Sequence, residues 1–257
     1  MSKSPRGLAS ADLTLADRLR AVTCSLRSGE VTAICGPNGA GKSTLLSCLA
    51  GLLGPESGSV ALDGKPLSEM PLAERARRIG LLPQTPEVAW DVSVAALVRL
   101  GRLPWKGAPA AEAQAAIDEA LAALDLEELR DRTVSRLSGG ERARALMARV
   151  LATRPEWILT DEPLAALDLA HAARQADGLR AQAAAGCGVV IVVHDLEAAM
   201  NRADRVLVLD KGALVADDVP VAALTSQTIA RVWGYSASWQ QAPSGWRSLI
   251  PDQAAAR

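Results

Sequence analysis

Apolar runs alternate along this chain with segments whose apolar positions recur at helical spacing. Val31–Cys35 is apolar and β-branched, and Val189–Val193 is a continuous apolar run, typical of a strand that is buried on both faces. Trp157–Thr160 and Arg205–Leu209 also read as strands, and helical patterns lie between these runs. Strands that alternate with helices predict an α/β fold with a mainly parallel sheet.

Two regions depart from this alternation. Residues up to about Arg27 alternate weakly and are followed by the turn Ser28–Glu30, which predicts an N-terminal antiparallel β part. A mostly helical stretch begins near Thr85, and its Ala-rich stripe over Ala110–Leu124 is best interpreted as a face packed between helices. We therefore predict one domain over residues 1–257, with a core from 1–84 and 154–220, a helical subdomain from 85–153 and a C-terminal extension from 221–257.

The composition argues against several classes of protein. The net charge of -1 gives no global basic field for nucleic acid, and no apolar run approaches the ~18 residues that span a bilayer. Met1–Asp12 has no apolar stretch typical of a secretory signal. The four cysteines are scattered among apolar neighbours, so we expect buried, reduced thiols rather than a metal site or disulfides.

The pattern G-x-x-x-x-G-K-S follows the first buried strand. Glycines let the backbone curl so that several N–H groups point at one anion, and the following helix adds the positive end of its dipole. Lys42 supplies a charge for the β- and γ-phosphates of a nucleotide, and Ser43 offers a hydroxyl to Mg²⁺. An ordinary strand-to-helix turn is the alternative, which the complete motif disfavours. The predicted phosphate-binding residues are Gly36, Pro37, Asn38, Gly39, Ala40, Gly41, Lys42, Ser43 and Thr44.

A carboxylate pair follows the strand Trp157–Thr160. Asp161 can reach Mg²⁺ directly or through water, and Glu162 suits a general base for an attacking water. Acidic residues are also favoured at a helix N-terminus by the helix dipole, which is the alternative interpretation. The glycine loop upstream makes the catalytic interpretation the stronger one.

Three further candidate sites are weak signals in isolation and gain support from the two motifs above. Ser138, Gly139 and Gly140 precede a helix predicted over Arg142–Ala152 and form a second candidate cradle for an anion, with Ser138 as the cap. Gln84 directly follows a strand, where its amide could coordinate the metal or order water. His194 ends the most apolar strand, at the sheet edge where ligands bind, and can hydrogen-bond a γ-phosphate.

In chain order, these motifs resemble those of the ATP-binding-cassette (ABC) ATPases: GPNGAGKST, Gln84, LSGGE at 137–141, ILTDEP at 158–163, LAALD at 164–168 and His194. The resemblance implies a P-loop NTPase fold with a helical signature subdomain. It implies that the chain hydrolyses ATP with Mg²⁺, with Glu162, His194 and Gln84 as catalytic residues and Ser43, Gln84 and Asp161 at the metal.

The resemblance also implies partners. Two chains would form a homodimer in which Ser138, Gly139 and Gly140 serve the partner's γ-phosphate, while Asp168 lies in the loop that communicates across the interface. The surface after Gln84, through Trp90 and Trp105, would face a membrane permease. The chain would then lie peripherally at the cytoplasmic face of the inner membrane, with no nucleic acid partner.

A closer resemblance, to one group within the family, rests on segments that are not part of the nucleotide-binding motifs. These segments are Arg77–Gln84, Val98–Pro104, Leu167–His171, Trp233–Tyr235 and Trp246–Ile250. They look like importers of ferric siderophores, haem and cobalamin, which implies an ATPase that powers uptake of a metal chelate and works indirectly with a solute-binding protein. An exporter ATPase stays open as an alternative. So does a cassette protein working on DNA or ribosomes, although this chain lacks their long insertions or second cassette. A non-hydrolysing module is disfavoured because Glu162 and His194 are both present.

One departure from the family concerns the base. The family stacks adenine on an aromatic residue upstream of the phosphate loop, and no aromatic residue precedes Trp90 here. Leu15, Ala16 or Arg18 would have to pack against the base, so we expect weaker base discrimination without loss of phosphate binding. Thr160 is a second departure, since this strand position is normally aliphatic; a bond from its hydroxyl to nearby backbone would make it tolerable.

Overall fold

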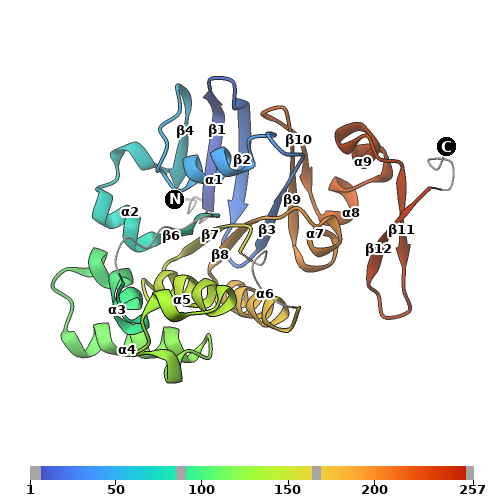
Figure 1. Cartoon of the computed structure of the whole chain (residues 1–257). Helices are drawn as coiled ribbons and strands as arrows, with labels where there is room; N and C mark the ends of the chain where they lie inside the picture. Colours follow the sequence, from blue (N-terminus) through green and yellow to red (C-terminus); the bar gives the residue numbers. More distant parts are fainter. Residues whose placement is uncertain (1–6, 85–90, 164–168, 253–257) are drawn as a thin grey trace. The chain divides into compact units, whose positions relative to one another are not determined.

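The computed structural model describes residues 7–84, 91–163 and 169–252. The chain packs into two compact units. The first unit combines Met1–Ser68 with Val190–Arg257, and the second unit is Glu69–Val189 (Figure 1). These boundaries are not those predicted for the core and the helical subdomain, and the division at residues 84 and 153 stays a prediction.

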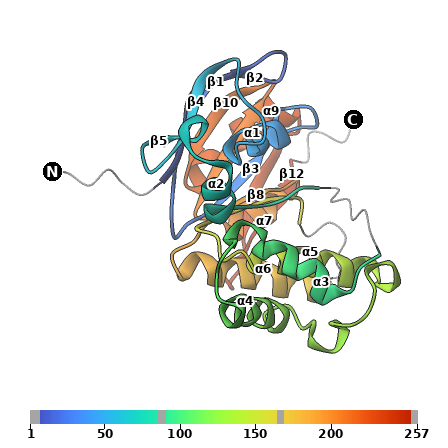
Figure 2. The ribbon, with the colours of Figure 1, turned by 90° about the vertical axis from the view of Figure 1, so that its left-hand side faces the viewer.

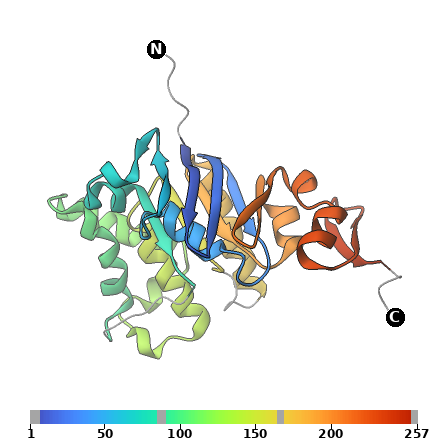
Figure 3. The same ribbon diagram turned by 90° about the horizontal axis from the view of Figure 1, so that it is seen from above.

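An antiparallel sheet forms the N-terminal part of the first unit, as the alternation up to Arg27 predicts. β1 (Gly7–Leu15) pairs with β2 (Leu19–Arg27) on one side and with β4 (Ser57–Leu62) on the other, and β5 (Lys65–Pro66) continues the sheet beyond β4. Figure 3 shows β1 and β2 as neighbouring blue arrows. Along β2 the buried side chains alternate with exposed ones, because one face of this sheet is packed and the other is not.

The buried strands of the first unit belong to a second sheet. β3 (Val31–Cys35) is parallel to β9 (Arg205–Asp210), which forms an antiparallel hairpin with β10 (Ala213–Asp218). The order in this unit is β10-β9-β3-β8, where β8 is Gly188–Val192 and contains the boundary between the units. Every residue of β3 and β8 is buried, which confirms the interpretation of the apolar runs. Helix α1 (Lys42–Leu49) follows β3, and α7 (Leu196–Arg202) follows β8.

The second unit joins two parallel strands to a group of helices. β6 (Ile79–Leu82) pairs with β7 (Trp157–Asp161). Helices α3, α4 and α5 pack on one another (Figure 2), and α4 buries Ile117 and Leu121 on the Ala-rich stripe, which confirms its interpretation as a packing face. The helices of the unit are α2 (Leu72–Arg78), α3 (Val94–Arg99), α4 (Ala110–Ala122), α5 (Gly139–Leu151) and α6 (Leu169–Ala184), with short 3-10 segments at Leu100–Trp105, Glu127–Leu129 and Val134–Arg136. A further 3-10 segment, Leu67–Glu69, contains the boundary between the units.

The C-terminal extension contains elements that the apolar pattern did not predict. Helices α8 (Pro220–Ala223) and α9 (Ser226–Trp233) precede a two-stranded hairpin of β11 (Ala237–Gln241) and β12 (Arg247–Pro251). Only Ala237 of β11 is buried, so this strand has no apolar stripe from which it could be predicted.

The four cysteines are free and buried, as predicted. Burial raises the pKa of Cys35 and of Cys187 to about 12, so both are neutral thiols at ordinary pH. Within the described ranges, the structure has no helix that combines the length and the apolar character needed to cross a membrane.

Candidate functional site

The glycine loop Gly36–Gly41 connects β3 to α1 in a conformation that demands glycine at two points. Gly36 has φ 151°, and a Cβ there would collide with the carbonyl oxygen of Leu209. Gly41 has φ 98° as the N-cap of α1, and a Cβ there would lie 2.5 Å from the carbonyl oxygen of Arg18. Gly39, with φ 77°, is surrounded by open space instead. The loop is therefore tightly enclosed at its two ends and open at its middle.

The β9–β10 turn braces the loop through a backbone hydrogen bond and is itself bonded to β2. The N–H of Gly212, in the β9–β10 turn, donates to the carbonyl of Ala40 over 3.1 Å. The carbonyl of Gly212 in turn accepts the N–H of Arg20 over 2.8 Å. These bonds hold the loop before any ligand arrives, which lowers the entropy cost of binding an anion.

Lys42 is the buried cation of this loop. Its side chain is 7% exposed, and Nζ donates to the carbonyls of Gly36 at 2.8 Å and Pro37 at 3.0 Å. Ser43 and Asn38 are exposed, and Thr44 is buried in α1. A buried ammonium beside curled backbone N–H groups is suited to a polyphosphate and, being fixed, needs little reorganisation to hold one.

His194 belongs to the same unit as the loop. The N–H of Val193 donates to the carbonyl of Ile34 over 3.1 Å, so His194 comes directly after the point where β8 is bonded to the loop's own strand. The His194 side chain is exposed. Asp195 then caps α7, accepting the N–H groups of Glu197 at 2.8 Å and Ala198 at 3.2 Å. The phosphate loop and His194 thus leave neighbouring strands at the same edge of the sheet.

The carboxylate pair lies in the second unit, at the end of β7. Asp161 is 6% exposed, and its Oδ1 is buried without a hydrogen-bond partner among the described residues. Glu162 is partly exposed and has the left-handed φ of 51°. Gln84 is exposed just beyond β6, whose Leu82 pairs with Thr160 of β7. Gln84 lies just beyond a strand and Asp161 ends one, as the sequence predicts, and the structure shows that these two strands are adjacent.

Ser138 caps α5 through a reciprocal pair of bonds. Its Oγ accepts the N–H of Glu141 at 3.2 Å, and its own N–H donates to Glu141 Oε2 at 2.8 Å. The bond from the Ser138 N–H holds the pKa of the Glu141 carboxyl below its usual range, assisted by Arg132, whose Nη1 lies 3.5 Å from Oε1. α5 begins at Gly139, three residues before the predicted start, because this capping box starts the helix. The Ser138 hydroxyl accepts from the helix, so its proton can point outward.

The sequence analysis did not identify Glu141 or Gly212 as parts of the candidate site. The S-x-x-E spacing from Ser138 to Glu141 is the signal that could have identified Glu141. The bracing role of Gly212 has no local signal. Asp168 and Trp90 lie outside the described residues, and the catalytic and binding roles assigned to the other residues stay predictions.

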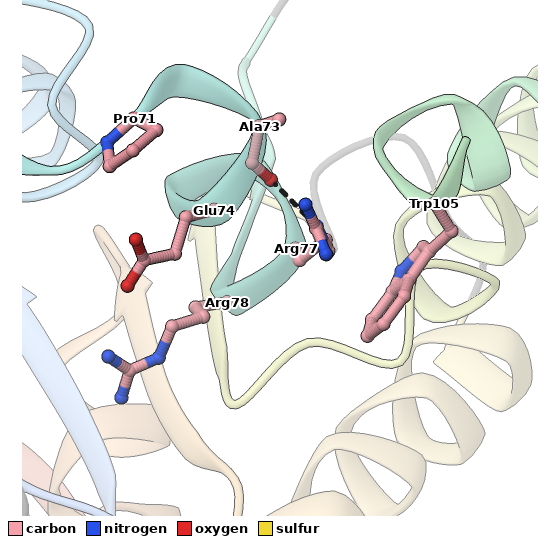
Figure 4. A pocket seen from close by; sticks show the side chains of 6 residues that line it. All are labelled: Pro71, Ala73, Glu74, Arg77, Arg78 and Trp105. Atoms are coloured by element: carbon pink, nitrogen blue, oxygen red, sulfur yellow. Dashed lines mark hydrogen bonds between the residues drawn. The ribbon is translucent and has the colours of Figure 1, made fainter. Parts of the chain in front are cut away.

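A pocket of about 430 Å³ opens in the second unit (Figure 4). The guanidinium of Arg77 lies 5.4 Å from the ring centroid of Trp105, whose Nε1 donates to the carbonyl of Thr153 over 2.9 Å. Arg78 is paired with Glu156 at 2.7 Å. The pocket is lined by Pro71, Ala73, Glu74, Arg77, Arg78 and Trp105.

Comparison with known proteins agrees with the motif order. The sequence model described as ABC transporter matches residues 19–165. The hemin import ATP-binding protein HmuV of Rhodococcus jostii is 41% identical over 230 residues, which cover 89% of this chain and 79% of that protein. HmuV of Nocardia farcinica is 45% identical over 213 residues, covering 82% and 74%.

Solved structures agree with the fold. The cbiO1 protein of Clostridium perfringens, part of the ABC transporter complex cbiONQ, superposes with a TM-score of 0.77 at 29% identity over 88% of this chain and 94% of that one. The ATP-binding cassette MJ0796, in a dimeric post-hydrolysis state with ADP and Pi, superposes with a TM-score of 0.74 at 26% identity over 83% and 98%.

Proposed function

Because the chain belongs to the ABC transporter family, we propose that it is the ATP-hydrolysing subunit of an importer that takes up a metal chelate of the hemin class through a partner permease. As a member of this family the chain binds nucleotide. The observation that carries the ATPase is the braced loop around the buried Lys42. The import direction and the chelate rest on the relatives that are named hemin import proteins.

Phosphate binding is the first step of this function. Lys42 and the N–H groups of Gly39–Thr44 would bind the β- and γ-phosphates, with α1 adding its dipole. The residues also suit Mg²⁺: the buried Oδ1 of Asp161 lacks a partner within the described part of the chain, and the hydroxyl of Ser43 is exposed. Those two groups and Gln84 would hold the ion, which when bound neutralises charge on the phosphates.

Hydrolysis would follow from Glu162 and His194. Glu162 accepts a proton from the attacking water, and its left-handed backbone is a conformation that costs on the order of 1 kcal/mol and is concentrated at active sites. His194 donates a hydrogen bond to the γ-phosphate from the edge of the sheet that also delivers the phosphate loop. Asp168 is assigned to the communicating loop by its motif alone.

A second copy of the chain would complete each site. Ser138, Gly139 and Gly140 stand at the exposed start of α5, where the free hydroxyl proton of Ser138 and the helix dipole suit a γ-phosphate. The dimeric state of MJ0796 with ADP and Pi supports this homodimer. On this proposal, each chain binds ATP with its own Lys42 and presents Ser138 to the nucleotide of the other.

Replacing Glu162 by Gln tests the ATPase. We expect kcat to fall about 100-fold or more, because a positioned general base contributes that much, while ATP affinity stays near that of the native chain. Glu127→Gln, an exposed carboxylate of the same unit, is the matched control. Hydrolysis by Glu162→Gln at the native rate would remove Glu162 from the mechanism.

The pocket beside Trp105 supports a docking surface for the permease. Its wall carries the guanidinium of Arg77, and the neighbouring Leu72 and Leu103 are 69% and 60% exposed. A cationic wall with apolar neighbours suits a short partner helix that carries an acidic side chain and apolar residues. Peripheral attachment to the cytoplasmic face of the membrane and the indirect link to a solute-binding protein belong to the same proposal.

The docking proposal has its own test. Arg77→Glu should abolish co-purification with a partner permease and leave the ATPase rate of the isolated chain unchanged. Arg231→Glu on α9 is the control and should keep both co-purification and the native ATPase rate. Hemin-dependent growth of a strain carrying each variant checks the transported class. Uptake of a different chelate by the transporter with the native chain would overturn the hemin assignment and leave the proposed ATPase activity unaffected.

A further inference from the structure

The C-terminal hairpin is fastened to helix α7 by side chains that take the place of a neighbouring strand. Asn201 donates from Nδ2 to the carbonyl of Arg247 at 2.7 Å, and its Oδ1 accepts the Arg247 N–H at 2.8 Å. Glu197 Oε1 accepts the N–H of Leu249 at 3.0 Å. The other edge of β12 is paired with β11, so both edges of this strand make hydrogen bonds.

The spacing of these bonds makes the attachment specific in register. Glu197 and Asn201 are one helical turn apart on one face of α7, a rise of ~6 Å. Arg247 and Leu249 are two residues apart on β12, a rise of ~6.7 Å, and they point their N–H groups to the same side. The two repeats match when the strand runs antiparallel to the helix. A shift of one residue along β12 would break the bonds of both side chains at once.

Helix α7 is also tied to the candidate site in the same unit. Its N-cap Asp195 is the residue after His194, and its first turn is fixed because the Asp195 carboxylate accepts the N–H groups of Glu197 and Ala198. Its inner face places Ala199 and Met200 in a core cluster with Ala33 and Cys35 of β3, the strand that leads into the phosphate loop. Glu197 lies only three residues from His194, and its carboxylate is bonded to the hairpin.

We propose that the β11–β12 hairpin sets the position of His194 through α7, with Glu197 and Asn201 as positioning residues for ATP hydrolysis. The inference rests on the proposed role of His194. The other strand of the hairpin, β11, is fastened by Trp239, whose Nε1 donates to the carbonyl of Leu224 over 2.6 Å. Arg202 of α7 lies 6.0 Å from the Trp246 ring centroid. α7 is thereby held between the hairpin and β3, and loss of the hairpin bonds frees one side of the helix.

The test separates nucleotide binding from hydrolysis. Asn201→Ala should lower kcat about tenfold, because displacement of a positioning group by a fraction of an ångström is costly, while the dissociation constant of a fluorescent ATP analogue stays within about twofold. Glu197→Ala should act likewise. Glu197→Gln should restore hydrolysis, because the amide Oε1 still accepts the Leu249 N–H.

Thr225→Ala is the matched control. It removes the cap bond from the Thr228 N–H at the start of α9 and so weakens the C-terminal extension without touching α7. It should lower Tm as Asn201→Ala does, yet keep the native kcat. If kcat instead falls in proportion to Tm in both variants, the hairpin contributes only stability and the inference is overturned.

His194→Ala distinguishes a failure of the hairpin inference from a failure of the proposed role of His194. A large loss of kcat in His194→Ala, with native hydrolysis in Asn201→Ala and Glu197→Ala, would overturn the inference alone. Native hydrolysis in His194→Ala would overturn the proposed role of His194 and the inference with it.

Discussion

The carbonyl oxygen of Arg18 lies 2.5 Å from the position that a Cβ would take on Gly41. This approach joins the β1–β2 turn to the start of α1, where Gly41 adopts its left-handed φ of 98°. The antiparallel sheet therefore supports the phosphate loop directly. Two consequences follow, one for the glycines of the loop and one for the nucleotide base.

Alanine at Gly41 should abolish nucleotide binding, whereas alanine at Gly39 should not. Both positions have positive φ, so each substitution costs about 1–2 kcal/mol of stability in backbone strain. At Gly41 the new methyl also meets the Arg18 carbonyl, while at Gly39 nothing lies within 4 Å. Urea unfolding and titration with a fluorescent ATP analogue measure both effects. Equal loss of binding in the two variants would show that strain alone, and not the contact with Arg18, controls the loop.

Arg18→Ala should weaken ATP binding by about twofold to fivefold. Arg18 is exposed at the turn beside the loop, and its guanidinium makes no hydrogen bond or ion pair within the described part of the chain. A guanidinium over a purine contributes about 0.5–1 kcal/mol at an exposed site, and it does not read the edge of the base. The native chain should therefore bind GTP nearly as well as ATP.

Arg27→Ala, at the other end of β2, is the control for this prediction, since Arg27 is paired with Glu30 at 3.4 Å. Arg18→Tyr should restore or tighten ATP binding by supplying an aromatic face. Competition of ATP and GTP for the fluorescent analogue gives all the constants. Strong preference for ATP in the native chain, unchanged in Arg18→Ala, would place base recognition elsewhere.

The chemistry-bearing residues of the candidate site were predictable because each follows a strand with a strong apolar pattern. The buried runs of β3, β7 and β8 determined where Gly36, Asp161 and His194 would emerge. The supports of these residues were not predictable in the same way. Gly212 and Arg18 reach the phosphate loop through backbone atoms, which leave no signature in side-chain pattern.

The C-terminal hairpin shows the same limit for the fold. β12 is held by the side chains of Glu197 and Asn201, which are distant in sequence, so its local pattern carries little information about it. Local signals that were present, such as the S-x-x-E spacing at Ser138, did determine a helix start. Sequence therefore predicts an element where burial or capping is local, and fails where tertiary hydrogen bonds decide.

Asp161→Asn should stabilise the chain in the absence of nucleotide and abolish Mg²⁺-dependent hydrolysis. The buried Oδ1 lacks a hydrogen-bond partner among the described residues, and an unsatisfied buried carboxylate oxygen costs about 1–3 kcal/mol. An amide carries no charge and is less costly to bury, so the free energy of unfolding should rise. Chemical denaturation without nucleotide checks the stability, and the rate of phosphate release with Mg²⁺ and ATP checks the hydrolysis. A less stable variant would mean that the native carboxylate is satisfied in the folded chain.

Protonation of Glu141 should weaken the start of α5 in a narrow acidic window. The Ser138 N–H lowers the pKa of this carboxyl in the folded chain, with Arg132 and Arg144 adding to the effect. A lowered folded pKa means that the stabilisation is complete above the unfolded pKa and is lost as pH falls through the folded one. Glu141→Gln keeps an acceptor for Ser138 but cannot titrate, so the stability difference between native chain and variant should shrink as the pH falls below the usual range of a glutamate carboxyl. Glu141→Ala should cost about 1 kcal/mol at pH 7 through loss of half the capping box. Urea unfolding of the native chain and both variants at neutral and acidic pH measures these effects. The remaining carboxylates are common to all three chains, so they do not contribute to the differences in stability. If the stability difference between the native chain and Glu141→Gln does not change with pH, the negative charge of Glu141 adds nothing to its hydrogen bond with Ser138.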